Sequence, residues 1–263
     1  METTFTITLP SLIFICFMVG LAGFVDAVAG GGGTISIPAY MFTGMPAHIA
    51  LGCNKFSSSC GTTLTVFKFW KNGALDIKAA AIAAISSFAG SALGTKVALM
   101  LSDQTIKTLL IFILPAVAVI LSLKKDFGEK DLSAQIDKKQ AIFLALVIGF
   151  FIGGYDGLFG PGTGTFAIIA FSMVMKYDLK KASGNAKILN LSSNIASMLT
   201  FAMAGAIMYK VAIPAAICCL AGNYYGSHCA LTKGAKFIRP MMMVVLAMLL
   251  AKIVYDLYLM KPL

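Results

Sequence analysis

The chain has 263 residues, of which 59% are hydrophobic and only 12% are charged, and its mean hydropathy is +0.87. A soluble domain of this length needs a far more polar surface, so the composition argues against one and indicates an integral membrane protein. The formal net charge is +10. Because the lysines gather in short loops between apolar stretches, we interpret this excess as a topology signal and as contact with anionic lipid headgroups, and we expect no nucleic-acid partner.

The first apolar stretch, Leu9 to Phe24, continues directly into a glycine-rich motif, Gly30 to Thr34. It has no basic region before it, so we interpret it as part of the mature protein and not as a signal peptide. Glycines at this density open the hydrogen-bond ladder of a helix. Non-helical backbone at membrane depth survives only where protein buries it or where it lines a wet cavity. We therefore predict a broken, re-entrant hairpin here.

The second segment, residues 48–63, carries polar side chains at membrane depth. Lys55, Ser58 and Thr62 are spaced i, i+3, i+7 and share one face of a helix, and Asn54 precedes them. A lysine at the centre of a span costs roughly 3 kcal/mol to insert, so we expect it to face a pathway. The alternatives are a lysine that snorkels to the headgroups and polar side chains that only hydrogen-bond between helices.

Two further apolar spans, Ala79 to Thr95 and Thr108 to Leu123, complete the first half. The third segment is rich in small residues, which lets helices approach closely. The polar stretch Lys124 to Gln140 then joins this half to a second series of apolar spans that begins at Ala141.

The second half repeats the first. The run Ala89 to Gly94 returns as Ala221 to Gly226, and the same offset places Lys55 on Lys187. The glycine motif returns as Gly160 to Thr165. An aspartate stands four residues before each motif, Asp26 in one half and Asp156 in the other. Shared offsets that carry Gly, Asp, Lys and Asn are hard to obtain by chance in apolar sequence.

The polar stripe of the second half consists of Lys187, Asn190 and Asn194, again at i, i+3, i+7. With one residue of slippage, Asn54 aligns with Asn185. Two polar stripes, each headed by a lysine, are what an anion site between repeats would need.

The distribution of charge decides between parallel and inverted repeats. If each glycine-broken segment enters and turns back, each half crosses the membrane three times and most basic loops fall inside. We therefore predict an all-α integral membrane protein of two inverted repeats, each a re-entrant hairpin plus three transmembrane helices, with both termini outside. The predicted units are residues 1–123 and 141–263, joined by a cytoplasmic linker at 124–140, in one membrane domain.

The glycine backbones could form nests of N–H groups that hold an oxyanion, with threonine hydroxyls beside them, or could serve only to let tight hairpins turn. Asp26 and Asp156 could take up a proton and couple transport to a proton gradient, or could be structural partners of loop amides or lysines. The predicted substrate-binding residues are Gly32, Gly33, Thr34, Asn54, Lys55, Ser58, Gly162, Thr163, Gly164, Thr165, Asn185, Lys187, Asn190 and Asn194.

The six cysteines and two histidines show no metal spacing, so we expect no metal and no other cofactor. Nor does the chain contain a nucleophile elbow, a zinc-protease motif or a close carboxylate pair with an adjacent base. We therefore predict that the protein is not an enzyme.

These motifs resemble the TauE/SafE sulfite exporter family, also called TSUP, and in particular its YfcA-like branch of membrane transporters. In the first half the resemblance is carried by residues 23–33, by Ile37 to Ala39 and by Asn54-Lys55. In the second half it is carried by residues 154–164, 186–190, 193–195 and 238–241 and by the end of the chain. It covers nearly the whole sequence, and Cys53 stands where relatives commonly carry threonine.

The resemblance implies a multi-pass protein of the bacterial inner membrane that moves small sulfur-containing anions such as sulfite, sulfonates or thiosulfate, generally as an exporter. We accordingly predict a secondary transporter with alternating access between the two repeats. A passive anion channel and a membrane scaffold without transport are the alternatives. Family analogy and the small-residue faces also suggest a homodimer.

Overall fold

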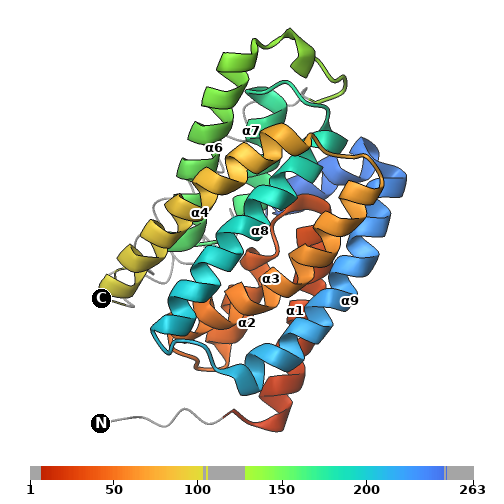
Figure 1. The fold of residues 1–263 in the computed structure, drawn as a ribbon. Coiled ribbons are helices and arrows are strands. Elements are labelled where there is room, and N and C mark those ends of the chain that lie inside the picture. The colour runs from red at the N-terminus through yellow and green to blue at the C-terminus, as the bar shows by residue number, and fades with distance from the viewer. Residues whose placement is uncertain (1–6, 103–104, 106–127, 246, 248–263) are drawn as a thin grey trace, which may run out of the picture.

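The computed structural model describes residues 7–102, 105, 128–245 and 247, and all regular structure in these residues is helical (Figure 1). The predicted span Thr108 to Leu123, the start of the linker and the C-terminal residues 248–263 lie outside the described residues. The described part is therefore an all-α bundle, in agreement with the all-α class that the sequence predicts.

Helices of matching length follow one another in the two halves. The first half contains α1 (Leu9–Ala29), α2 (Gly33–Phe42), α3 (Ala47–Lys71) and α4 (Ile77–Met100). The second contains α6 (Lys138–Leu158), α7 (Thr163–Met173), α8 (Leu179–Met203) and α9 (Tyr209–Lys233), preceded by a 3-10 turn at Ser133–Gln135. Helix α1 and helix α6 both have 21 residues, α3 and α8 both have 25, and α2 and α7 have 10 and 11. The sequence repeat is thus also a repeat of helix lengths.

Aspartates fix the starts of three long helices. The side chains of Asp76, Asp137 and Asp178 accept hydrogen bonds from backbone N–H groups in the first turns of α4, α6 and α8. Such caps satisfy donors that have no partner within the helix and favour the positive end of the helix dipole. Each cap lies next to a polar loop, so these loops mark the ends of the bundle.

The outer helices pack through small residues. Helix α9 lies against α1, and α4 lies against α6. A Cβ atom on Gly222 would lie 1.9 Å from the carbonyl oxygen of Gly20, and one on Gly90 would lie 2.2 Å from that of Phe150. Helices α9 and α4 each carry a second glycine four residues after the first, so the backbones in each pair stay in contact over a full turn, as in other membrane helix pairs.

Helices α3 and α8 cross at the centre of the bundle, with α2 packed on α3 and α7 on α8 (Figure 1). Among the described residues, α1, α4 and α6 are long and apolar enough to cross a membrane. The outer surfaces of α1, α4, α6 and α9 expose large apolar side chains, for example Phe17, Ile85, Phe151 and Ile217. A surface of this kind is suited to lipid, whereas the polar residues of α3 and α8 lie inside.

Four segments meet at one end of the molecule and together carry eight basic against five acidic side chains. They are residues 72–78, 128–137, 174–181 and 233–239, hereafter the basic end. The backbone N–H of Leu132 donates to Lys176 O at 2.9 Å, and the Tyr177 hydroxyl donates to Asp76 Oδ2 at 2.8 Å. An ion pair at 3.8 Å joins Arg239 to Glu129. Helix α6 starts and α7 finishes at the basic end, whereas α1 starts and α2 finishes at the opposite end (Figure 1).

Candidate functional site

The two glycine-rich breaks, one between α1 and α2 and one between α6 and α7, touch each other inside the bundle. Gly30 has a φ of 76°, and a Cβ on it would lie 2.4 Å from Gly164 Cα. Thr165 donates its backbone N–H to Gly30 O at 3.2 Å and its hydroxyl to Ala29 O at 2.8 Å. Only glycine permits both the left-handed conformation and this approach. The breaks predicted from sequence are therefore real, and they face one another.

Beside this contact lies a small polar cavity to which both halves contribute. Its free space is about 10 Å³, roughly what one water molecule needs. Side chains from α1, α3, α6 and α8 and the two glycine breaks surround the cavity. Its lining consists of Asp26, Gly30, Gly33, Asn54, Lys55, Ser58, Asp156, Gly160, Asn190 and Asn194.

Lys55 is the cation of this cavity. It is only 1% exposed, and its Nζ lies 2.6 Å from Asp156 Oδ2, an ion pair between the two halves. The same Nζ donates to Asn194 Oδ1 at 3.2 Å. Since the amine ends inside the protein, Lys55 does not snorkel to a headgroup. A buried pair of this kind offsets part of its desolvation cost only when the two charges lie this close.

Lys187 is the equivalent residue of α8 and is fully buried. Its Nζ donates to the backbone carbonyl of Asp26. The carboxylate of Asp26 instead accepts the backbone N–H of Gly32 at 3.3 Å, so it holds the first glycine break. Both lysines thus point inward, and each reaches the chain segment before the glycine break of the other half.

The amide side chains extend the polar lining. Asn194 donates to Asn190 Oδ1 one turn earlier in α8. In α3, Asn54 Oδ1 accepts the hydroxyls of Ser36 at 2.6 Å and of Ser58 at 3.5 Å. The stripes predicted on α3 and α8 therefore converge on one polar region and do not form two separate ones.

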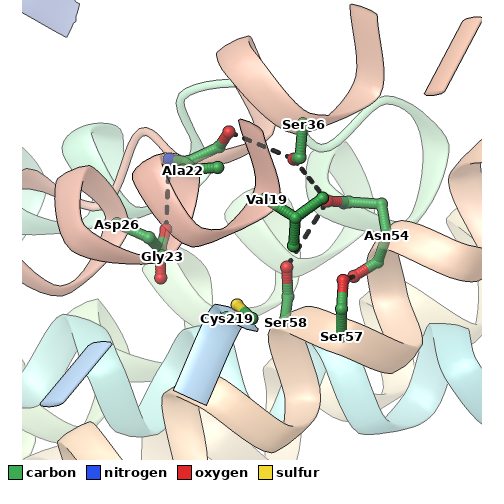
Figure 2. Close-up of a pocket in the computed structure, with 10 residues that line it drawn as sticks. Val19, Ala22, Gly23, Asp26, Ser36, Asn54, Ser57, Ser58 and Cys219 are labelled. Carbon is green, nitrogen blue, oxygen red and sulfur yellow. Dashed lines mark hydrogen bonds between the residues drawn. The ribbon is translucent and has the colours of Figure 1, made fainter. Parts of the chain in front are cut away.

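A second small cavity adjoins the first and shares Asp26, Asn54 and Ser58 with it. Figure 2 shows Ser36 and Ser58 directed at Asn54 from opposite sides, with Cys219 of α9 at the rim. Ser36 lines this second cavity but is not among the residues predicted from the sequence. Its signal was present: it is a serine two residues after the glycine motif, in an otherwise apolar helix.

Some predicted residues lie elsewhere. Asn185 accepts the backbone N–H of Asp76 at 2.8 Å near the basic end and does not line the cavity. The hydroxyls of Thr34, Thr163 and Thr165 donate to the carbonyls of Gly31, Gly160 and Ala29, so they close the glycine breaks. Gly162 starts α7 in the left-handed conformation and is likewise outside the lining.

Metal chemistry has no visible site in the described ranges, where no group of three or more His, Cys, Asp or Glu side chains could hold an ion. The free cysteines are scattered over α1, α3 and α9. The described residues instead bring paired charged side chains and amide side chains together where the two halves meet.

A lipid-suited helical bundle that encloses buried, paired charges at two broken helices is the design of a membrane transporter. Residues 15–253 match the family model described as sulfite exporter TauE/SafE, and the chain belongs to this family. No solved structure is a significant match.

Curated relatives agree with this class. The chain is 35% identical over 246 residues to a "Probable membrane transporter protein" of Haemophilus influenzae, covering 93% of this chain and 95% of the relative. It is 33% identical over 245 residues to "Probable membrane transporter protein ORF9" of Sinorhizobium sp, covering 93% of each. It is 32% identical over 248 residues to "Probable membrane transporter protein YfcA" of Escherichia coli, covering 94% of this chain and 91% of the relative.

Proposed function

We propose that this protein is a secondary transporter that exports small sulfur-containing anions, such as sulfite, sulfonates or thiosulfate. The observation that carries the proposal is the burial of Lys55, with amide donors beside it, in a cavity built by both halves. Cations buried at membrane depth mark substrate pathways. The description of the matched family as a sulfite exporter supports the substrate class.

The proposed binding site differs in part from the set predicted by sequence. Lys55, Asn190 and Asn194 would hold the anion from α3 and α8, and Asn54 and Ser58 would orient it. Lys187 would fix the Asp26 segment against α8. The backbone at Gly33 and Gly160 lines the cavity, so these parts of the glycine breaks would meet the anion.

Alternating access between two inverted repeats is the proposed mechanism. Equivalent close approaches support the symmetry: a Cβ on Gly52 would lie 2.0 Å from Ala206 O, and one on Gly184 would lie 1.9 Å from Ala74 O. The hairpin α1–α2 starts and finishes at one end of the bundle and α6–α7 at the other, which is the relation that inverted repeats require. A cavity with room for one water would be the contracted state of the site, which widens when one half moves against the other.

The basic end would face the cytoplasm of a bacterial cell, with the protein in the inner membrane. Its four segments together carry eight basic against five acidic side chains, and short cytoplasmic loops carry such an excess. The re-entrant hairpins would then enter from opposite sides of the bilayer.

The small size of the cavity favours a carrier over a passive channel, because a channel needs a continuous path with weak binding. The buried lysines also argue against a pure scaffold, since inserting them into a membrane costs free energy and such residues usually serve a transport pathway.

Flux in proteoliposomes tests the proposal, with sulfite, thiosulfate, sulfoacetate and sulfate offered separately. We expect saturable flux of at least one sulfur anion, and we expect Lys187→Met to lower it by about tenfold or more, as for the loss of a charged contact. Lys71→Met, at an exposed position near the basic end, is the matched control and should transport normally. Wild-type flux in Lys187→Met would contradict the role of Lys187. Absence of flux for every anion would contradict the function.

A further inference from the structure

The Lys55 ammonium, to which an anion should bind, already has a carboxylate and an amide oxygen as partners. Asp156 Oδ2 lies 2.6 Å from Lys55 Nζ and is the strongest partner of that amine. Asn194 occupies a second donor direction at 3.2 Å. An incoming oxyanion and the Asp156 carboxylate are both negative oxygen ligands of one ammonium group, so they compete for it.

The charges around the cavity sum to zero. Lys55 and Lys187 are the cations, and Asp26 and Asp156 are the carboxylates. An added anion would leave one uncompensated negative charge among largely buried side chains, which a protein interior strongly disfavours. A neutral balance returns if a proton arrives with the anion.

The surroundings of Asp156 contain few other groups that could accept this proton. Helix α3 presents Lys55, and α8 presents Asn194 and Asn190. On α6 itself the neighbouring Tyr155 donates its hydroxyl to Pro161 O at 2.7 Å and points to the second glycine break. Helix α4 contributes the Thr95 hydroxyl, which bonds Gly157 O. The remaining carboxylate on the cavity wall is Asp26 of α1.

The two carboxylates differ in what their protonation would release. Asp26 accepts a backbone N–H of the glycine break, and no ion pair within the described residues joins its carboxylate to an amine. Asp156 holds Lys55 directly. Protonation of Asp156 therefore frees a cation for the substrate, whereas protonation of Asp26 loosens a loop.

We propose that Asp156 is the coupling carboxylate of an anion–proton symport, in which a proton bound at Asp156 Oδ2 releases Lys55 and the anion replaces the carboxylate on Lys55 and Asn194. This inference rests on the proposed function. The proton comes from water on the side to which the site is open and forms an O–H bond on Asp156, while Lys55 keeps its own protons. Proton and monovalent anion leave together on the other side, and the Lys55–Asp156 pair closes again.

The test uses proteoliposomes with an entrapped pH indicator and methanesulfonate, which stays a monovalent anion at every pH used. We expect about one proton to move with each anion in the same direction, without net current, because the linked site stays neutral. In Asp156→Asn, anion flux should persist without proton movement and should carry current. Asp131→Asn removes a carboxylate that pairs with Lys181 at the basic end and lies outside the cavity lining, so this matched carboxylate variant should keep the proton-to-anion ratio of the wild type.

The possible results distinguish failure of this inference from failure of the proposed function. Wild-type anion flux without proton movement, or proton movement that persists in Asp156→Asn, overturns the inference and leaves the proposed function intact. Absence of flux for methanesulfonate and for all other sulfur anions overturns both. If Asp156→Asn does not fold, the wild-type protein in weakly buffered detergent decides: saturable methanesulfonate binding should take up about one proton, and binding without uptake overturns the inference.

Discussion

Lys55 and Lys187 stand at the same position of α3 and α8, yet they are bound differently. Lys55 closes an ion pair with Asp156 of the other half at 2.6 Å. Lys187 contacts the backbone carbonyl of Asp26, whose carboxylate turns to Gly32. The residue types of the two pairs are identical, so the difference comes from their neighbours and from the arrangement of the halves.

The neighbours explain part of the difference. One and two turns after Lys187, α8 carries Asn190 and Asn194, where α3 carries the shorter Ser58 and Thr62. Asn194 reaches across to Lys55 at 3.2 Å. The Thr62 hydroxyl is buried and has no hydrogen-bond partner in the part of the chain that the structure describes. The two similar halves thus form one complete lysine site, in which Lys55 has both a carboxylate and an amide partner, and one incomplete site at Lys187. The complete site is the candidate for anion binding.

The largest expected effect comes from breaking the complete site. Lys55→Met leaves the Asp156 carboxylate buried without its cation, which costs about 3–5 kcal/mol of unfolding free energy. Lys55→Met combined with Asp156→Asn should recover most of that stability, since no charge stays unpaired. Unfolding in detergent measures both variants. Equal stability of Lys55→Met and the wild type would show that the ion pair is absent in the membrane protein.

Asn194→Thr makes the stripe of α8 resemble that of α3. It removes the hydrogen bond to the Lys55 ammonium, and a bond to a charged group contributes about 1.5–3 kcal/mol. We expect anion affinity to fall by about tenfold or more, with Thr62→Ser as the control on the other stripe. A thermal-shift titration with sulfite, thiosulfate and sulfoacetate measures it. Unchanged affinity in Asn194→Thr would place the anion away from Lys55.

Gly164→Ala tests the contact between the two glycine breaks. The added methyl group would lie 2.4 Å from Gly30 Cα, so the breaks must separate, at a cost of about 1–3 kcal/mol for overpacking. Gly205→Ala meets no atom within 4 Å but has a φ of 67°, so it reports backbone strain without a clash. We expect Gly164→Ala to lower flux and Gly205→Ala to spare it. The reverse result would show that the contact between the glycine breaks is not part of the transport mechanism.

The smallest effect is expected at the basic end, where Asp131 and Lys181 form a partly exposed ion pair at 2.6 Å. Partial burial opposes ionisation of Asp131, but hydrogen bonds from Lys181 and Ser133 outweigh it and hold the pKa of the carboxyl below its ordinary value. The stabilisation is present above the pKa of the unfolded chain and is lost as the pH falls through the lowered folded-state pKa. Asp131→Asn should cost at most about 1 kcal/mol and leave flux unchanged. A large loss of flux would link this end to gating.

Much of this architecture follows from local sequence signals. Glycine clusters in apolar sequence indicate broken helices, and a lysine at i with polar residues at i+3 and i+7 indicates an inward face, because burial of such residues needs partners. These signals predicted the two breaks, both buried lysines and the stripes of α3 and α8. The aspartates were also identified, with a lysine pair among their alternatives.

The partner choices could not be predicted, because they depend on the tertiary crossing of α3 and α8. Sequence alone does not tell whether Asp26 or Asp156 pairs with Lys55. The prediction for Asn185 illustrates the limit: its position in α8 is one residue before that of Asn54 in α3, and one residue turns a side chain by about 100° around the helix. It therefore caps the segment before α4 at Asp76 and does not join the cavity.

Counterflow in proteoliposomes tests most directly whether the Lys55–Asp156 site carries a small sulfur anion. Vesicles loaded with unlabelled methanesulfonate or thiosulfate receive a trace of the labelled ion outside. The account predicts transient, saturable accumulation of label in the wild type and none in the Lys55→Met, Asp156→Asn double variant, which removes the site without leaving a buried charge. Accumulation by the double variant at the wild-type rate would show that the Lys55–Asp156 site does not carry the anion.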